Sequence, residues 1–200
     1  SSDDEDEEQR IETTEGLNRF AWNLRYKVPF ERPNGIVMWG GGGNGPKVVP
    51  GTYEVRLAVG DSSQTQTLVI ERDPRLETTQ EQFEQQLQLA QRVGERLNEL
   101  WTSLVDLRTV KKQTDWWTDR LNDDEDADDV RALAEELVER LTEVEGDMTQ
   151  LQGEANQDAL NFPGRLDNQW AELYSAISNP DSQMTAGSFL RFEDLNPQLD

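Results

Sequence analysis

The apolar residues of this chain recur with a period of two before Pro74 and with a helical period after Arg75. Tyr53, Val55 and Leu57 alternate with polar residues, which is typical of a strand with one buried face. Beyond Arg75, apolar residues recur in alternating steps of three and four, which predicts amphipathic helices. We therefore predict an α+β fold, in which an N-terminal Ig-like antiparallel β-sandwich is followed by an antiparallel bundle of three to four helices.

This change of period divides the chain into three predicted parts. Residues 1–15 are predicted to be a disordered acidic linker, because the run Asp3 to Glu8 repels itself and has almost nothing to bury. A linker of this kind is also expected where a larger protein is trimmed to its last module. Residues 16–76 are predicted to form the small β-sandwich domain, and residues 77–200 the helical bundle domain.

The predicted sandwich starts with a strand through Phe20, Trp22 and Leu24, whose neighbours are largely polar. A hairpin follows, in which the strand around Val55 turns at Gly60-Asp61-Ser62-Ser63 and returns through residues 67–70. Between the first strand and the hairpin lies the glycine run 40–43. No Lys-Ser or Lys-Thr pair follows this run, so a flexible surface loop is favoured over a phosphate-binding loop.

The helical part is predicted to contain two long helices that pair antiparallel. The first begins at a capping box of Thr78 and Glu81, and the second begins near Asp128 or Asp129. The first predicted seam consists of Phe83, Leu87, Ala90, Val93, Leu97, Leu100, Leu104 and Leu107. The second consists of Val130, Leu133, Leu137, Leu141, Val144, Met148 and Leu151. Shorter helices are predicted from Leu166 to Ile177 and after Thr185, a candidate N-cap.

Two adjacent tryptophans, Trp116 and Trp117, lie near the end of the first long helix. Adjacent helical residues cannot both face one seam, so one indole is left over. It either packs on a neighbouring element or marks a contact surface, and internal packing is favoured because large aromatic side chains are usually buried.

The sequence contains neither histidine nor cysteine. Ser-His and Cys-His nucleophiles, zinc sites of His or Cys and disulfides are therefore excluded. The acidic run 123–129 lacks the glycine and the final glutamate of an EF-hand, so a helix start is favoured over a calcium site. We predict no catalytic, cofactor-binding or metal-binding residue. Paired carboxylates for glycoside hydrolysis stay open, although nothing singles out one pair.

The formal net charge of −22 places further limits on partners. Nucleic-acid binding is not expected, because it needs a basic stripe that this sequence lacks, and no apolar run is long enough to span a bilayer. Only four of the 19 basic residues are lysines, and the acids are spread over the whole chain. This pattern is typical of a salt-adapted surface, as in halophiles; an ordinary acidic protein is the alternative.

Several motifs occur in a recognisable order. They are Gly16-Leu17-Asn18-Arg19-Phe20-Ala21-Trp22-Asn23-Leu24-Arg25-Tyr26, Gly45-Pro46, Pro50-Gly51-Thr52-Tyr53-Glu54-Val55-Arg56-Leu57, residues 65–70, Asp73-Pro74-Arg75, Asn161-Phe162-Pro163 and residues 166–169. The set resembles the C-terminal region of large bacterial proteins with sortilin-like or BNR-repeat β-propellers, which are often labelled glycosyl hydrolases. The likeness runs from Gly16 to the end, mainly as pattern in the helical part.

The resemblance implies an exported protein, periplasmic, cell-surface or secreted, whose propeller lies upstream of this chain. The implied function is that of a non-catalytic accessory or interaction module, with the propeller of the same polypeptide as its partner. Two alternatives stay open. One is that the chain belongs to a carbohydrate-active enzyme whose catalytic residues lie mainly upstream, which would show as a pocket with facing carboxylates. The other is self-association through the helices, which would leave an apolar stripe exposed in the monomer.

Overall fold

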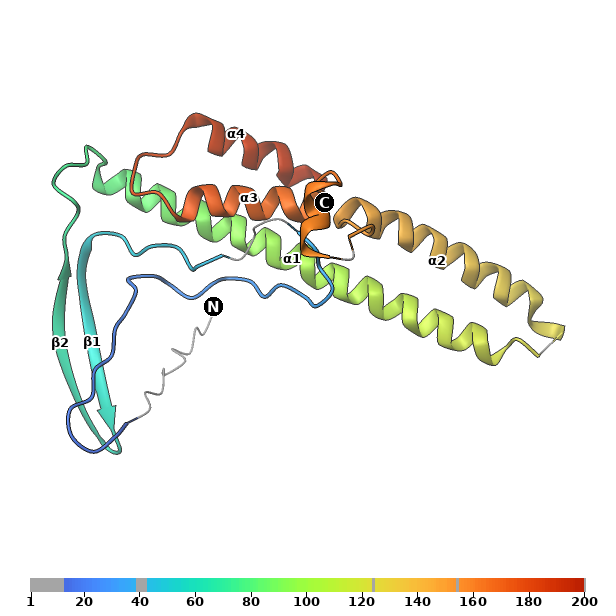
Figure 1. Ribbon diagram of the computed structural model, residues 1–200, viewed down its shortest axis with the longest axis horizontal. Helices are drawn as coiled ribbons and strands as arrows, with labels where there is room; N and C mark the ends of the chain where they lie inside the picture. Colours follow the sequence, from blue (N-terminus) through green and yellow to red (C-terminus); the bar gives the residue numbers. More distant parts are fainter. Residues whose placement is uncertain (1–12, 39–42, 124, 154, 200) are drawn as a thin grey trace.

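The computed structural model describes residues 13–38, 43–123, 125–153 and 155–199. Two strands, β1 (Gly51–Val59) and β2 (Ser62–Ile70), precede four helices, α1 (Gln80–Arg120), α2 (Asp128–Met148), α3 (Leu166–Ser178) and α4 (Ala186–Leu195). Three short 3-10 turns lie at Glu125–Ala127, Asn156–Leu160 and Asn196–Gln198. Helix α1 runs nearly the length of the molecule, with the hairpin near one end and α2 along the other (Figure 1).

Helix α1 begins one residue later than the sequence predicts. Thr79 is the N-cap, with φ −80° and ψ 162°, and its hydroxyl accepts a hydrogen bond from the Gln82 N–H. The Thr79 N–H in turn donates to the side-chain oxygen of Gln82. The capping box is therefore Thr79 with Gln82 instead of Thr78 with Glu81. Thr78 is buried, and its hydroxyl donates to the carbonyl of Asp181.

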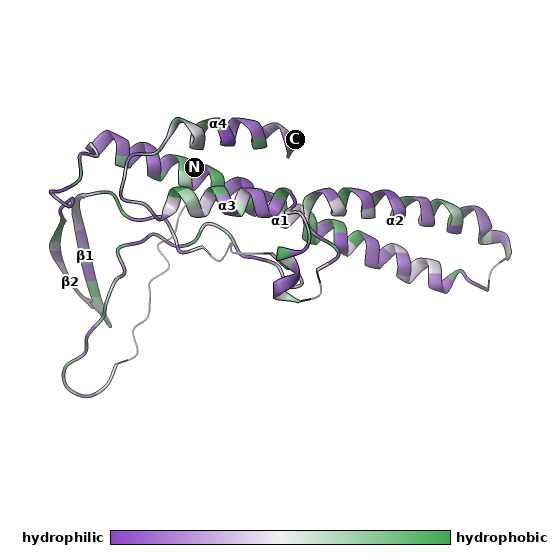
Figure 2. Ribbon diagram, turned by 45° about the horizontal axis from the view of Figure 1, so that its top comes forward, coloured by the Kyte–Doolittle hydropathy of each residue, from purple (hydrophilic) through white to green (hydrophobic). Residues whose placement is uncertain are grey.

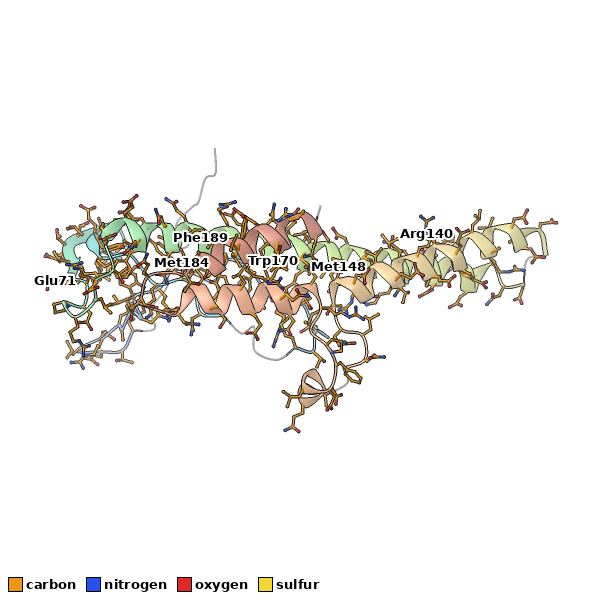
Figure 3. The ribbon with its side chains drawn as sticks, turned by 90° about the horizontal axis from the view of Figure 1, so that it is seen from above. Glu71, Arg140, Met148, Trp170, Met184 and Phe189 are labelled. Atoms are coloured by element: carbon orange, nitrogen blue, oxygen red, sulfur yellow. The ribbon has the colours of Figure 1, made fainter. Side chains whose placement is uncertain are left out.

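The core lies along the first half of α1, where α3 and α4 cover it. The predicted α1 seam is confirmed at its centre, since Leu97, Leu100 and Leu104 are fully buried. Trp101 and Trp170 join them, and Trp170 lies between the helices in Figure 3. Ile36 and Met38, from the region predicted as sandwich, belong to the same core. The segment before the hairpin therefore packs as part of the helical body.

Extended residues before the hairpin are held against α1 and α3. Pro29 lies over Gly94 of α1, where a Cβ would come within 2.2 Å of the proline ring. The Arg25 guanidinium donates to the carbonyls of Gly45 and Ser178. Gly94 thus provides the close approach on which this packing depends.

The prediction of an Ig-like β-sandwich is wrong. The only sheet in the described residues is the antiparallel pair β1 and β2. The predicted strand through Phe20, Trp22 and Leu24 does not form, because its ladder is limited to the bridge between Arg25 and Lys47. Leu24 has φ 57°, which no regular strand adopts.

Proline residues explain why this ladder is short. It consists of Tyr26 N–H donating to the Pro46 carbonyl and Val48 N–H donating to the Leu24 carbonyl, at 2.9 and 3.0 Å. Pro46 has no N–H of its own, and Pro50 follows shortly after, so this segment offers few donors for a longer pairing. Alternation of apolar residues therefore did not suffice to make a second sheet.

The predicted α2 seam is wrong at most of its positions, although Leu141 and Met148 are partly buried and Met148 packs against the core. Val130, Leu133, Leu137 and Val144 are exposed. The less exposed positions of α2 are Arg131, Ala134, Val138, Leu141, Thr142, Glu145, Gly146 and Met148. Glu145 bonds to Arg108 and Lys111 of α1, which identifies this second set as the contact face. The four exposed α2 residues of the predicted seam lie beside that face.

Some predictions fall on residues outside this description. Residues 1–12 of the predicted linker, Gly40 to Gly42 of the glycine run and Asp124 of the acidic run are among them. In the described part of the chain, no helix combines the length and the apolar character that crossing a membrane requires.

Candidate functional site

The hairpin β1–β2 has one apolar and one polar face. Residues directly opposite across an antiparallel pair share a face. The pairs Tyr53 with Leu68, Val55 with Gln66 and Leu57 with Gln64 therefore lie on one side, together with Val59. The other face carries mainly Thr, Glu, Arg and Ser side chains. Gly60 makes the two-residue turn possible with φ 56°, as type II′ hairpin turns require at their first central position.

The apolar face of this hairpin is not covered. Val55 is 50% exposed, Leu57 57% and Val59 70%. Both outer strand edges are unpaired within the described residues, because each strand has only the other as partner. A two-stranded sheet is marginal by itself, and exposed edges of this kind favour pairing with further strands.

Residues before the hairpin enlarge this surface. The ring of Trp22 meets that of Tyr53 edge-on, with centroids 6.0 Å apart, and the segment runs beside β1 (Figure 1). Leu17, Phe20 and Trp22 are themselves exposed. We define the apolar hairpin surface as Trp22, Tyr53, Val55, Leu57, Val59 and Leu68. Exposed apolar residues gathered on one face mark a site of interaction in soluble proteins.

The tryptophans at the end of α1 are both on the surface. Trp116 is 51% and Trp117 59% exposed, so the prediction that the second indole packs internally is wrong. Their rings stack edge-on at 4.7 Å, and the Arg120 guanidinium lies over Trp116 at 4.4 Å. Within the described residues, no further element packs beside this two-helix part to cover them.

A cavity of about 300 Å³ lies between the hairpin base, the start of α1 and the end of α3. The carboxylates of Glu71, Asp73 and Asp181 line it. Asp73 is paired with Arg75 at 2.5 Å and Asp181 with Lys47 at 2.7 Å. Two of the three carboxylates are thus engaged by cations, which differs from a pair of free carboxylates that face each other across a substrate.

Two buried acids were not singled out by the sequence. Burial alone would raise the pKa of Glu145, but hydrogen bonds from Lys111 and Arg108, both 2.7 Å long, hold that pKa below its ordinary value. Burial raises the pKa of Asp167, although its carboxylate accepts bonds from the Thr149 hydroxyl and the Asn168 N–H, both at 2.6 Å. Both acids join separate segments of the protein through these hydrogen bonds. In the sequence, only apolar neighbours three and four residues away could have indicated that they are buried.

The acidic run is arranged as a helix start. Asp128 and Asp129 occupy the first turn of α2, where carboxylates interact favourably with the helix N-terminus. Asp128 also pairs with Arg131. Among the described residues, which leave out Asp124, no three acidic side chains gather as metal ligands would.

No known protein family, curated protein or solved structure matches the chain. The resemblance to sortilin-like and BNR-repeat proteins thus rests on the ordered motifs alone, and the apolar hairpin surface is the feature from which a function has to be argued.

Proposed function

We propose that this chain is a non-catalytic interaction module that docks through its apolar hairpin surface onto an upstream domain of the same, larger polypeptide. The observation that carries the proposal is the exposed apolar face of β1 and β2, which has the alternation of a half-buried sheet but no covering layer. Docking of a further strand or sheet layer would bury that face and satisfy an open edge.

The ordered motifs support the nature of this partner. Their likeness to the C-terminal region of exported sortilin-like propeller proteins supplies a β-rich upstream domain, and such a domain can offer both strands and apolar surface. The excess of acids supports a salt-rich setting, because carboxylates keep a surface hydrated where charge is screened.

A photocrosslinking amino acid placed at Leu57 in the full-length protein of the source cells tests this proposal. We expect crosslinks to an upstream domain of the same polypeptide, with a total mass well above 22.9 kDa in an extracytoplasmic fraction. The same probe at Arg56, on the polar face, is the matched control and should give few crosslinks. A full-length mass equal to that of this chain, or crosslinks of equal yield from both positions, would contradict the proposal.

A further inference from the structure

The second half of α1 and the whole of α2 form a two-helix arm. The buried residues of α1 end at Leu104, and Glu145 is the one fully buried side chain that α2 contributes among the described residues. Helices α3 and α4 lie over the other half of α1, so the arm extends beyond them (Figure 1). We define the helical arm as residues 105–148. Two helices bury only one stripe each, and the other flanks of the arm face solvent.

One flank of α2 in this arm is apolar. Val130, Leu133, Leu137 and Val144 fall within a sector of about 60° at 100° per residue. Leu133 is 66% exposed and Val130 54%. Hydrophobic positions recur along α2 in Figure 2. The stripe spans about 20 Å, or roughly four helical turns.

Helix α1 adds to the same side of the arm. Val110 and Trp117 lie two turns apart on α1. Viewed down the helix axis, both are rotated by about 90° from the face on which Lys111 binds Glu145, against the direction in which the chain winds. The α2 stripe also lies about a quarter turn back from its contact face. In an antiparallel pair, flanks displaced in the same sense lie on the same side. We define the apolar arm face as Val110 and Trp117 of α1 together with Val130, Leu133, Leu137 and Val144 of α2.

The charge around the apolar arm face is strongly acidic. Helix α2 contains eight acidic and two basic residues. Asp129, Glu136, Glu143 and Asp147 follow the outer rim of the apolar stripe, with Arg140 as the one cation there, and Figure 3 shows Arg140 on the arm, far from the core residue Trp170. A second copy would bring the same carboxylates to the interface, and like charges in contact are unfavourable.

We propose that the apolar arm face binds an amphipathic helix with basic flanks that belongs to another protein. Apolar residues of that helix at i, i+3, i+4 and i+7 would bury the stripe, as helix-in-groove complexes do. Its Lys and Arg side chains would meet the carboxylates of the rim. This surface lies on the other half of α1 from the apolar hairpin surface and is independent of the docking proposed for it.

Designed 21-residue peptides test this proposal on the whole chain by isothermal titration. One peptide carries a leucine stripe with lysine and arginine flanks, a second keeps the stripe with glutamate flanks, and a third keeps the basic composition with the leucines scrambled. We expect 1:1 binding of the first peptide, at least ten times weaker binding of the other two, and an affinity that falls as salt is added.

The double variant Leu133→Gln, Leu137→Gln should weaken binding of the first peptide at least tenfold. Both positions are exposed, so the fold should be kept, which circular dichroism checks. Leu190→Gln on α4, also exposed, is the matched control and should bind as the unmodified chain does. Equal binding of the ordered and scrambled basic peptides, or an unchanged affinity of the double variant, would overturn the proposal. A dimer at low salt that the double variant no longer forms would also overturn it, since the stripe would then be covered by a second copy of this chain.

Discussion

Two leucines that look alike in the sequence have different surroundings. Leu97 is fully buried under α3, whereas Leu137 is 43% exposed on the arm. We expect Leu97→Ala to lower the free energy of unfolding by about 2–5 kcal/mol, because it leaves a cavity in a packed core. Leu137→Ala should cost less than about 1 kcal/mol, since its side chain gives up little burial. Urea denaturation of both variants measures this, and equal losses would mean that α2 packs in the register predicted from its sequence.

Glu145 links the two helices of the arm through Arg108 and Lys111. Glu145→Gln should lower the free energy of unfolding by about 1–3 kcal/mol at pH 7, because glutamine keeps one acceptor oxygen but carries no charge and turns an NH2 group toward one of the two cations. The pKa of Glu145 is held below its ordinary value of 4.5, so its contribution is complete above that value and is lost as pH falls through the folded-state pKa.

The pH dependence of this variant follows from that sign. The difference in stability between the unmodified protein and Glu145→Gln should be constant from pH 7 to about pH 5 and should shrink below the ordinary glutamate pKa. Thermal unfolding of both proteins across pH 3 to 7 measures it. A difference that stays the same at pH 3 would show that the carboxylate charge contributes nothing.

Among the elements, α1 carries one glycine where the chain crosses it closely. Gly94→Ala would gain about 1 kcal/mol of helix propensity, but the new methyl group would lie 2.2 Å from Pro29. We expect net destabilisation of about 1 kcal/mol or more, because overpacking forces the backbone apart. Gly146→Ala in α2 is the matched control, since its methyl group meets only Leu151 at 3.6 Å and should stabilise the protein. Equal melting temperatures of the two variants would contradict this account of Pro29.

The elements themselves could be predicted wherever their signals are local. The alternation and turn glycine of the hairpin, the N-cap Thr185 and the step of three and four in α1 all depend on residues near each other in sequence. The sandwich could not, because a second sheet needs donors that Pro46 lacks and a regular backbone that Leu24 does not adopt. The register of α2 could not be predicted from its leucines alone, since the contact face combines Val138 and Leu141 with the buried Glu145 and its two cations.

At the scale of the whole molecule, the net charge of −22 opposes compaction. We expect the melting temperature to rise from dilute buffer to molar salt, because screening over about 3 Å at 1 M removes most repulsion between surface carboxylates. Calorimetry in sodium chloride measures this. Potassium chloride at the same ionic strength serves as a control for ion identity, and a melting temperature that is flat or falls with either salt would contradict the expectation.

The candidate surfaces were only partly predictable. The sequence shows which side chains are apolar, but exposure depends on which elements are present to cover them. Val55 and Leu57 were expected inside a sandwich, and Trp117 inside a bundle, yet each lies where the described chain provides no second layer. Correct local patterns combined with missing covering elements produced both surfaces.

Helix α1 is continuous for 41 residues, about 60 Å, from the hairpin end to the tip of the arm. Its number of residues therefore sets both the distance and the relative rotation between partners bound at its two ends. Inserting one residue after Leu104 would lengthen the span by only about 1.5 Å but would turn the distal portion by about 100° around the axis. Seven inserted residues would nearly restore the original bearing while adding about 10 Å. The relative orientation of two ligands held by this chain would thus change far more than their separation when the length of α1 changes by one residue.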